Sequence, residues 1–313
     1  MMKKISICVP AYSEEDNIQA LYTELTKVWQ KDLSGYTYEI VFVNDGSKDN
    51  TLSKMQELGR RDERVKVIDL SKNYGKEIAM LAGLDHCSGD AAVIMDSDLQ
   101  HPPELISKMV ELWELGYQDV YGRRVVRKKE PWLKIKLSQI YYKLLSFISQ
   151  TKIENGIGDF RLLDRECINA LIAIRDKERY TKGLYNLIGY KKVSIDFIAN
   201  ERFSGETKWT FKDLFKLALD GITSSSVKPL KLAIYAGFLM LIPAFFYFIY
   251  TFVRALSGKT ADVPGYSSLM IVILILGGIQ LISIGILGEY IGKIFVETKK
   301  QPPYFINKKN SKL

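Results

Sequence analysis

The chain has 313 residues, enough for one large domain or two smaller ones. Its formal net charge of +8 favours an anionic partner, such as a nucleic acid, a lipid headgroup or a phosphorylated substrate. The three cysteines, Cys8, Cys87 and Cys167, lie far apart and show no disulfide or metal-binding pattern, so we expect reduced thiols in the cytosol. We expect no signal peptide, because the first residues run directly into a predicted strand.

Apolar segments of strand length alternate with helical patterns over the first 115 residues. The predicted strands are 5–9, 38–43, 65–70 and 91–95. One predicted helix starts at Glu14 with Ser13 as its cap, a second follows residues 71–76 and ends near Asp85, and a third spans 103–115. This alternation predicts right-handed βαβ units and a mainly parallel sheet with both faces covered. The ends of the strands, at Pro10, Asp45 and Asp96, should line one edge and form a site of nucleotide size.

Asp96 and Asp98 follow the fourth predicted strand, which Pro102 and Pro103 prevent from continuing. Because successive side chains of a strand alternate between faces, we expect the two carboxylates to point the same way. Like charges this close repel unless a cation lies between them, and Mg²⁺ or Mn²⁺ prefers such oxygen ligands. The alternative is that Asp98 caps the next helix and Asp96 is a solvated turn residue.

Two further carboxylates, Asp45 and Asp159, each have two possible roles. The chain has neither a dinucleotide-binding glycine fingerprint nor a P-loop, so Asp45 is a candidate to bond a base or ribose directly. An Asx-turn within the Asn-Asp-Gly-Ser loop is the alternative for Asp45. Asp159 follows Gly156 and Gly158 and is either a catalytic carboxylate or a loop cap.

Basic residues lie beside aromatic and small residues at 179–183 and 202–209. Near a metal-diphosphate site these bases would act as phosphate clamps, and elsewhere they would be solvated surface residues. Residues 131–150 form a basic amphipathic pattern with Trp132 near its start. That helix would lie in a membrane interface or pack on the sheet.

Two long apolar segments follow, at 232–253 and 268–287, each close to the 20 residues or so that span a bilayer. The larger excess of lysines lies outside this pair, which predicts that both chain termini face the cytoplasm. A buried helical hairpin in a soluble core is the alternative. The two spans predict a multi-pass protein of the cytoplasmic membrane.

Five motifs in combination resemble glycosyltransferase family 2, specifically the bacterial polyprenyl-phosphate glycosyltransferases related to dolichyl-phosphate mannose synthase. They are Val-Pro-Ala-Tyr (9–12), Asn-Asp-Gly-Ser (44–47), Met-Asp-Ser-Asp-Leu-Gln-His-Pro-Pro-Glu (95–104), Gly-Asp-Phe-Arg-Leu (158–162) and Gly-Glu-Tyr-Ile-Gly (288–292). The resemblance covers nearly the whole chain. It implies an α/β domain with a GT-A, Rossmann-like fold over 1–229, including amphipathic helices at about 131–150 and 209–226. A transmembrane hairpin would follow over 230–292 and a basic cytoplasmic tail over 293–313.

The resemblance also implies a reaction and a set of site residues. The reaction is inverting transfer of a sugar, with glucose or N-acetylglucosamine on UDP favoured over mannose or aminoarabinose, to polyprenyl phosphate at the cytoplasmic membrane face. The nucleotide sugar would be held by Pro10, Tyr12, Glu14, Asp45, Lys76, Asp96, Ser97 and Asp98. Asp98 and Asp96 would bind Mg²⁺ or Mn²⁺, Gln100 would lie near the sugar, and Asp159 would be the catalytic carboxylate. Acceptor phosphate would be bound by Arg202, Lys208 and Arg179. Ser13 and Ser97 depart from the family, which usually has Asn and Ala there.

Other functions account for less of the sequence. A processive polysaccharide synthase would need more membrane spans and a Gln-x-x-Arg-Trp element, which the chain lacks. A catalytically inactive membrane scaffold is the alternative, but the complete set of acidic and basic residues argues against it. Nucleic-acid binding would explain the charge and not the apolar spans, so we expect no nucleic-acid partner. Relatives suggest a homo-oligomer.

Overall fold

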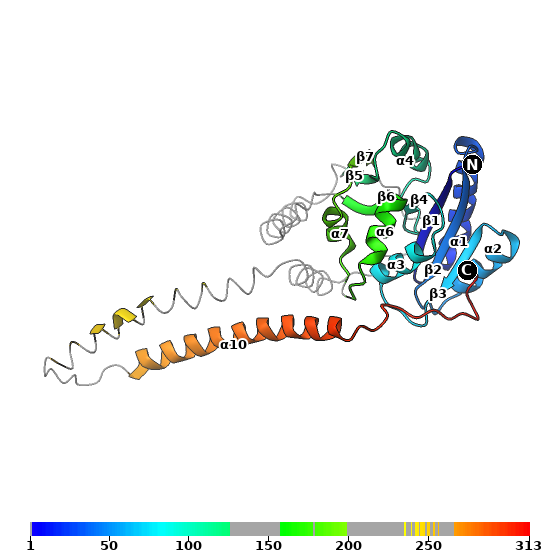
Figure 1. The fold of residues 1–313 in the computed structure, drawn as a ribbon. Helices are drawn as coiled ribbons and strands as arrows, with labels where there is room; N and C mark the ends of the chain where they lie inside the picture. Colours follow the sequence, from blue (N-terminus) through cyan, green and yellow to red (C-terminus); the bar gives the residue numbers. More distant parts are fainter. Residues whose placement is uncertain are drawn as a thin grey trace. The chain divides into compact units, whose positions relative to one another are not determined.

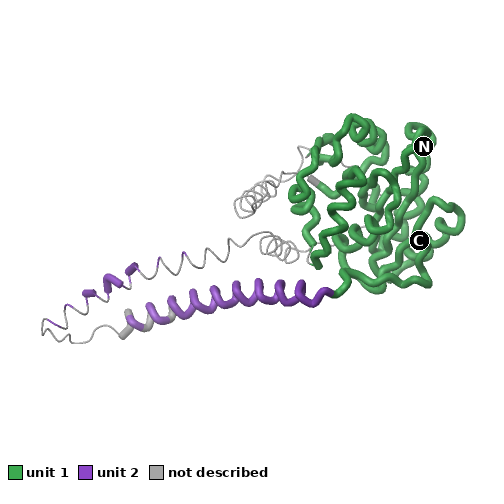
Figure 2. The backbone as a smooth tube through the Cα atoms, in the orientation of Figure 1, with its two compact units in different colours: residues 1–143, 151–210, 301–313 green, residues 144–150, 211–300 purple. Residues whose placement is uncertain are grey.

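The computed structural model describes residues 2–125, 157–177, 179–198 and 266–313, with isolated residues between 235 and 256. The predicted amphipathic helices, Arg202, Lys208 and most of the first predicted membrane span lie outside the described residues. The chain divides into two compact units (Figure 2). The first unit contains 1–143, 151–210 and 301–313, and the second contains 144–150 and 211–300.

Within the described residues, the first unit is built on a seven-stranded sheet of order β3-β2-β1-β4-β6-β5-β7 (Figure 1). Its strands are β1 (Lys4–Ala11), β2 (Thr37–Asn44), β3 (Val65–Asp69), β4 (Ala91–Ile94), β5 (Asp119–Arg124), β6 (Ile157–Asp164) and β7 (Lys192–Phe197). Strands β1 to β4 are parallel, as predicted. Strand β6 runs antiparallel to both β4 and β5, so the other half of the sheet is mixed.

Helices cover both faces of this sheet, as the alternating pattern predicted. The described helices of this unit are α1 (Glu15–Asp32), α2 (Thr51–Arg61), α3 (Lys76–His86), α4 (Leu105–Glu114), α6 (Arg165–Ala173) and α7 (Thr181–Leu187), whereas α10 (Tyr266–Thr298) belongs to the second unit. Apolar side chains of α1, α2 and α4 join one buried cluster, and those of α3, α6 and α7 join another. Alternate residues of one strand enter opposite clusters, for example Ile7 and Cys8 of β1. All three cysteines are buried and outside disulfides.

Two predicted helix starts differ from the observed ones. Helix α1 begins at Glu15, and its first turn has no side-chain cap, so the prediction of Ser13 as the cap was wrong. Ser13 instead has a φ of +55°, and its N–H donates to Ser47 Oγ at 3.0 Å. Helix α4 begins at Leu105 with no side-chain cap, so Asp98 does not serve as its cap.

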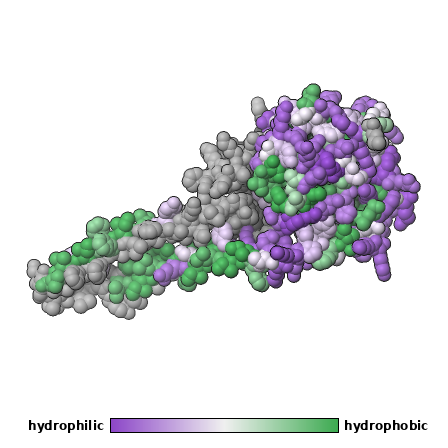
Figure 3. Space-filling view, in the orientation of Figure 1, coloured by the Kyte–Doolittle hydropathy of each residue, from purple (hydrophilic) through white to green (hydrophobic). Residues whose placement is uncertain are grey.

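Helix α10 contains the predicted second span. Its 33 residues correspond to a length of about 50 Å. Within the described residues, this is the one helix with a segment long and apolar enough to cross a membrane, Ile275–Thr298. Figure 3 shows hydrophobic side chains along it. The first span, at 232–253, stays a prediction.

The chain returns to the first unit after α10. Residues 301–313 lie along the outer edge of β3, where Ile306 and Lys312 form antiparallel bridges with Leu70 and Val67. The C-terminus therefore ends beside β3 and α2 (Figure 1). The region predicted as a basic tail thus includes a segment that is paired with the sheet.

Candidate active site

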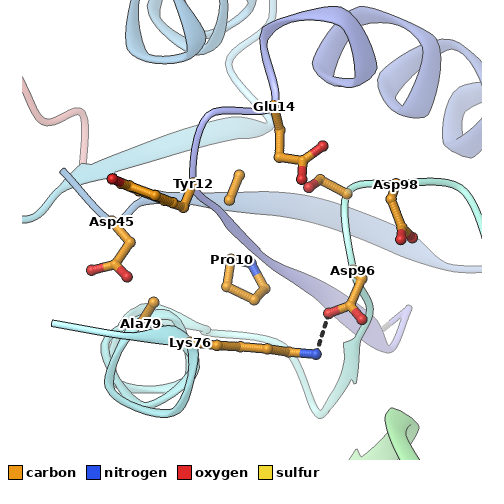
Figure 4. Close-up of a pocket in the computed structure, with 10 residues that line it drawn as sticks. Pro10, Tyr12, Glu14, Asp45, Lys76, Ala79, Asp96 and Asp98 are labelled. Carbon is orange, nitrogen blue, oxygen red and sulfur yellow. Dashed lines mark ion pairs between the residues drawn. The ribbon is translucent and has the colours of Figure 1, made fainter. Parts of the chain in front are cut away.

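A pocket of about 300 Å³ opens at the carboxyl ends of β1, β2 and β4 (Figure 4). Because parallel strands end at the same edge, their terminal residues meet there. The pocket is lined by Pro10, Ala11, Tyr12, Glu14, Asp45, Lys76, Ala79, Asp96, Ser97 and Asp98. All eight residues predicted to hold a nucleotide sugar therefore line one pocket, and Ala11 and Ala79 complete its wall.

Asp45 anchors the loop that precedes α3. Its carboxylate accepts hydrogen bonds from the N–H groups of Tyr74 (2.7 Å) and Gly75 (2.9 Å). The Asx-turn considered for Asp45 is not formed, because its two carboxylate oxygens accept from Tyr74 and Gly75. Its neighbour Asn44 accepts at Oδ1 from the N–H of Ser47, three residues further on, at 3.2 Å. Burial raises the pKa of Asp45, and the two N–H donors oppose that effect in part. Asp45 thus both lines the pocket and holds the loop that leads into α3.

Asp96 and Asp98 lie in a turn and not in a strand. Strand β4 ends at Ile94, so the alternation of strand side chains is not what directs both carboxylates into the pocket. Leu99 in this turn has a φ of +59°, and the N–H of Gln100 donates to Asp98 Oδ1 at 3.1 Å. The compact turn places Asp96 and Asp98 in the same pocket wall (Figure 4).

Lys76 connects two of the acidic groups. Its Nζ lies 2.6 Å from Asp96 Oδ1 (dashed in Figure 4) and 3.0 Å from Asp159 Oδ2. Burial alone would lower the pKa of Lys76, but the two carboxylates outweigh it and raise that pKa above its ordinary value. The Lys76 side chain is 44% exposed, so this cation is accessible to a ligand that enters the pocket.

Asp159 reaches the site from the mixed half of the sheet. Strand β6 runs antiparallel to β4, with Arg161 opposite Ile94, so Asp159 lies beyond the end of β4. Its side chain is only 8% exposed, and among the described residues Oδ1 has no hydrogen-bond partner. Although burial opposes ionisation, Lys76 and then Lys182 hold the pKa of Asp159 below its ordinary value. Asp159 is therefore an ionised and weakly basic carboxylate.

Sequence reasoning did not identify His101 as part of this site. The His101 ring stacks on Phe160, with a centroid distance of 4.7 Å. Its Nδ1 accepts a hydrogen bond from the N–H of Asp96 at 3.2 Å. Burial lowers the pKa of His101, so the neutral ring supports the backbone of Asp96. The position of His101 within the 95–104 motif is the sequence signal that could have identified it.

Two of the predicted phosphate-binding and sugar-binding residues, Arg179 and Gln100, are described but do not line the pocket. The Arg179 guanidinium is buried and donates to the carbonyls of Ile174 (2.6 Å) and Leu171 (3.0 Å) at the end of α6. These contacts favour a structural role for Arg179. Gln100 contributes its backbone N–H to Asp98 and is not part of the pocket lining. Arg202 and Lys208 lie outside the described residues.

The acidic residues fit a metal whose coordination a ligand completes. Among the described residues, no group of three or more His, Cys, Asp or Glu side chains is arranged to hold a metal ion. Asp96 and Asp98 supply two carboxylates, and Mg²⁺ commonly binds to one or two carboxylates together with substrate phosphates. Because Asp96 is also paired with Lys76, the donor set suits a metal that arrives with a diphosphate.

Comparison with known proteins agrees with this geometry. The family model for glycosyl transferase family 2 matches residues 6–172, and the model for the GtrB C-terminal hairpin matches residues 228–294. The chain is 41% identical over 306 residues to the putative glycosyltransferase CsbB of Bacillus subtilis, which covers 98% of this chain and 92% of the relative. It is 40% identical over 309 residues to the bactoprenol glucosyl transferase of Shigella phage SfV, with 99% and 100% covered.

Among solved structures, the mannosyltransferase PcManGT from Pyrobaculum calidifontis, in complex with GDP-Man and Mn²⁺, aligns with a TM-score of 0.48. The identity is 17%, and 93% of this chain and 88% of that one are covered. The family match spans more than half of the chain, and the two relatives, which align over nearly the full chain, are both named for transfer of a sugar. The chain therefore belongs to glycosyltransferase family 2 and is a glycosyltransferase with a GT-A-like mixed α/β sheet.

Proposed function

We propose that this enzyme transfers glucose from UDP-glucose to a membrane polyprenyl phosphate with inversion. The observation that carries the proposal is the single pocket in which Asp45, Asp96 and Asp98 lie together, with Asp159 joined to it through Lys76. Relatives of nearly equal length that are named bactoprenol glucosyl transferase support both the sugar and the acceptor.

The donor would lie along the carboxyl edge of the parallel strands. The Tyr12 side chain, which is 41% exposed, and Asp45 are placed to contact the nucleoside. Asp96 and Asp98 would hold the metal and the diphosphate. A bound Mg²⁺ or Mn²⁺ would neutralise charge on the leaving diphosphate. Lys76, which is accessible in the pocket, would bind a phosphate oxygen.

The main barrier to this reaction is the approach of two anions. Two unit like charges 4 Å apart repel by roughly 4 kcal/mol at an effective dielectric constant of about 20. Lys76 is one cation in place to offset this repulsion, and Arg202 and Lys208 are predicted to act on the acceptor side. The second pKa of a phosphate monoester is about 6, so the acceptor is mostly dianionic at neutral pH and needs little deprotonation.

Asp159 accordingly acts by orientation and electrostatics. Its carboxylate is held ionised beside Lys76, and a carboxylate with a lowered pKa is a poor proton acceptor. A fixed negative charge at the start of β6 would stabilise positive charge that develops on the sugar in the transition state. Asp159 would also orient the sugar or the acceptor.

Chain topology supports a membrane hairpin with the catalytic unit and both termini on one side, which we propose is the cytoplasmic side. Strand β7 precedes the hairpin region and residues 301–313 follow it, and both belong to the same compact unit. A single crossing by α10 would separate them, so a crossing by α10 requires a second one between residues 199 and 265. The match to a C-terminal hairpin over 228–294 agrees with this requirement.

The test is a transfer assay with detergent-solubilised full-length protein. Undecaprenyl phosphate, Mg²⁺ and a panel of UDP-glucose, UDP-N-acetylglucosamine, GDP-mannose and UDP-aminoarabinose would be supplied, and lipid-linked product read by mass. Product from UDP-glucose supports the proposal, and product from another donor alone reassigns the sugar. No product from any donor, despite nucleotide binding, would favour the inactive-scaffold alternative.

A further inference from the structure

The segment that follows α10 forms an additional edge on the sheet. Val67 and Lys312 exchange two backbone hydrogen bonds, of 2.9 and 2.8 Å. Two more join the chains further along β3: the N–H of Asn307 donates to the carbonyl of Asp69 at 2.8 Å, and the N–H of Ser71 donates to the carbonyl of Phe305 at 2.9 Å. We call residues 301–313 the return segment. It pairs with β3 and with the first residue of the loop after it.

Asp69 joins the return segment to the strand that carries Asp45. Asp69 Oδ2 accepts from Asn310 Nδ2 at 2.9 Å, and its backbone N–H donates to Ser311 Oγ at 2.9 Å. Asp69 Oδ1 accepts from Asn44 Nδ2 at 2.7 Å. Asp69 is only 4% exposed. A buried carboxylate thus connects Asn310 to Asn44, the residue that precedes Asp45.

A second connection runs through the loop 71–75. The return segment fixes the start of this loop at Ser71, and Asp45 fixes its end at Tyr74 and Gly75. The middle of the loop packs tightly on Gly46, where an added Cβ would lie 2.5 Å from the backbone nitrogen of Asn73. The loop is therefore tied to Asp45, which lines the pocket. The return segment is tied to the Asn44–Asp45 pair at two points, through Asp69 and through Ser71.

We propose that the return segment is a positioning element of the donor site. It holds the loop 71–75 and the Asn44–Asp45 pair in the arrangement that receives the nucleoside, so nucleotide affinity depends on residues that follow the membrane helix. This inference rests on the proposed role of Asp45 toward the nucleoside. The residues of the return segment act through Asp69 and Ser71 and do not touch the substrate.

The decisive experiment exchanges the hydrogen-bonding groups of Asp69 and Asn310. Asn310→Asp places a second carboxylate against Asp69 Oδ2, where like charges repel. We expect the Kd for UDP and the KM for the nucleotide sugar to rise about tenfold, equivalent to about 1.4 kcal/mol, with a smaller change in kcat. In the double variant Asp69→Asn/Asn310→Asp, the new amide accepts from Asn44 and donates to the new carboxylate, and UDP affinity should return.

Lys312→Ala is the matched control within the same segment. The Lys312 ammonium contacts the carbonyls of Gly59 (2.5 Å) and Asp62 (3.1 Å) near the end of α2, away from the loop. This variant should lower the melting temperature and leave the Kd for UDP unchanged. Equal loss of UDP affinity in Lys312→Ala and Asn310→Asp would mean that the segment contributes only general stability.

Two readouts separate the inference from the proposed function. Titration calorimetry of the full-length protein with UDP and with GDP tests the nucleotide site, and absence of binding by the unsubstituted protein would overturn the proposed function. Hydrogen exchange at the N–H groups of Tyr74 and Gly75 tests the bracing directly. Faster exchange in Asn310→Asp, restored in the double variant, supports the inference. Unchanged exchange, or unchanged UDP affinity in a protein that binds UDP, would overturn it.

Discussion

The two halves of the sheet deliver their carboxylates to the pocket by different routes. In the parallel half, Asp45 and Asp96 follow the carboxyl ends of β2 and β4. In the mixed half, Asp159 lies near the beginning of β6, because β6 runs against β4. One half thus presents strand ends and the other a strand start at the same edge. Lys76 bridges the two halves by pairing with Asp96 and Asp159.

This difference suggests that the two halves of the sheet have different roles in the reaction. The parallel half provides every residue of the pocket lining and would bind the nucleotide and the metal. The mixed half provides one nearly buried carboxylate with an oxygen that no described residue satisfies, and would act on the reacting sugar. Substitutions in the two halves should therefore have separable effects on donor binding and on turnover.

The largest effect should come from the parallel half. Asp98→Ala removes a proposed metal ligand, and we expect kcat/KM to fall by about 10³-fold, the upper end of the loss seen when one charge-stabilising group is removed. Activity at increasing Mg²⁺ concentrations is the measurement. Asp90→Asn is the control, since Asp90 immediately precedes β4, at the end of that strand opposite the pocket, and accepts from the N–H of Lys4. Near-normal activity of Asp98→Ala in the presence of a chelator would remove the metal from the mechanism.

Asp159→Asn in the mixed half should reduce kcat by about 10²-fold, within the usual range for one acid-base or orienting group. Donor affinity should change little, and the pH–rate profile should keep its shape, since the lowered pKa keeps Asp159 ionised at neutral pH. The measurement is kcat from pH 6 to 9 with both proteins. Loss of the alkaline plateau in the variant would identify Asp159 as an obligate proton acceptor.

Substitution of the bridging cation should have a smaller effect that touches both halves. Lys76→Gln removes a charge-assisted contact, and we expect kcat/KM to fall somewhat more than tenfold, from about 1.5 kcal/mol, the lower end of the range for a hydrogen bond to a charged group. Lys76→Arg keeps the charge and should recover part of the loss. Donor KM and kcat should both change in Lys76→Gln. A change confined to one of them would assign Lys76 to one half alone.

The smallest kinetic effect is expected at the edge opposite the pocket, where Glu39 is nearly buried. Burial opposes its ionisation, but hydrogen bonds from Lys4, Ser88 and Ser6 outweigh burial and lower the pKa of Glu39 to about 2, from 4.5. The resulting stability is fully present above pH 4.5 and is lost as the pH falls toward 2. It amounts to about 3 kcal/mol from 1.36 kcal/mol per pKa unit.

Glu39→Gln should therefore lower the free energy of unfolding by an amount of that order at pH 7, measured by urea titration, without changing donor KM. At about pH 2 and below, the two proteins should become similar in stability. Asp196→Asn, at the exposed pair with Arg123, should have almost no effect on stability. Equal losses in the two variants would show that burial of Glu39 does not determine its contribution.

The parallel half of the fold was predictable because its signals are local. Apolar strands that end in Pro10, Asp45 and Asp96 are visible in the sequence, and parallel connection alone brings these residues to one edge. Eight of the ten lining residues followed from those strand ends and from the family resemblance. The reason expected for Asp96 and Asp98 was nevertheless wrong, since a turn, and not strand alternation, directs them.

The mixed half was less predictable for a physical reason. Strand β5 contains Asp119, Gly122 and two arginines, which weaken any strand pattern. The direction of β6 depends on long-range pairing with β4, which no local pattern encodes, so the placement of Asp159 near Lys76 required the structure. Arg179 was predicted to bind phosphate because it lies near aromatic and small residues. In the structure its guanidinium donates to carbonyls at the end of α6 and does not face the pocket.

The pairing of the return segment with β3 also has a consequence for biosynthesis. The outer edge of β3 acquires its partner only when residues 301–313 have left the ribosome, after the apolar α10 sequence has already been made. Until then the domain presents an unpaired strand edge, which is a template for association with other chains. Maturation of the catalytic unit is therefore coupled to synthesis of residues 301–313, and chains that stop before residue 301 should be prone to aggregation even when their core is intact.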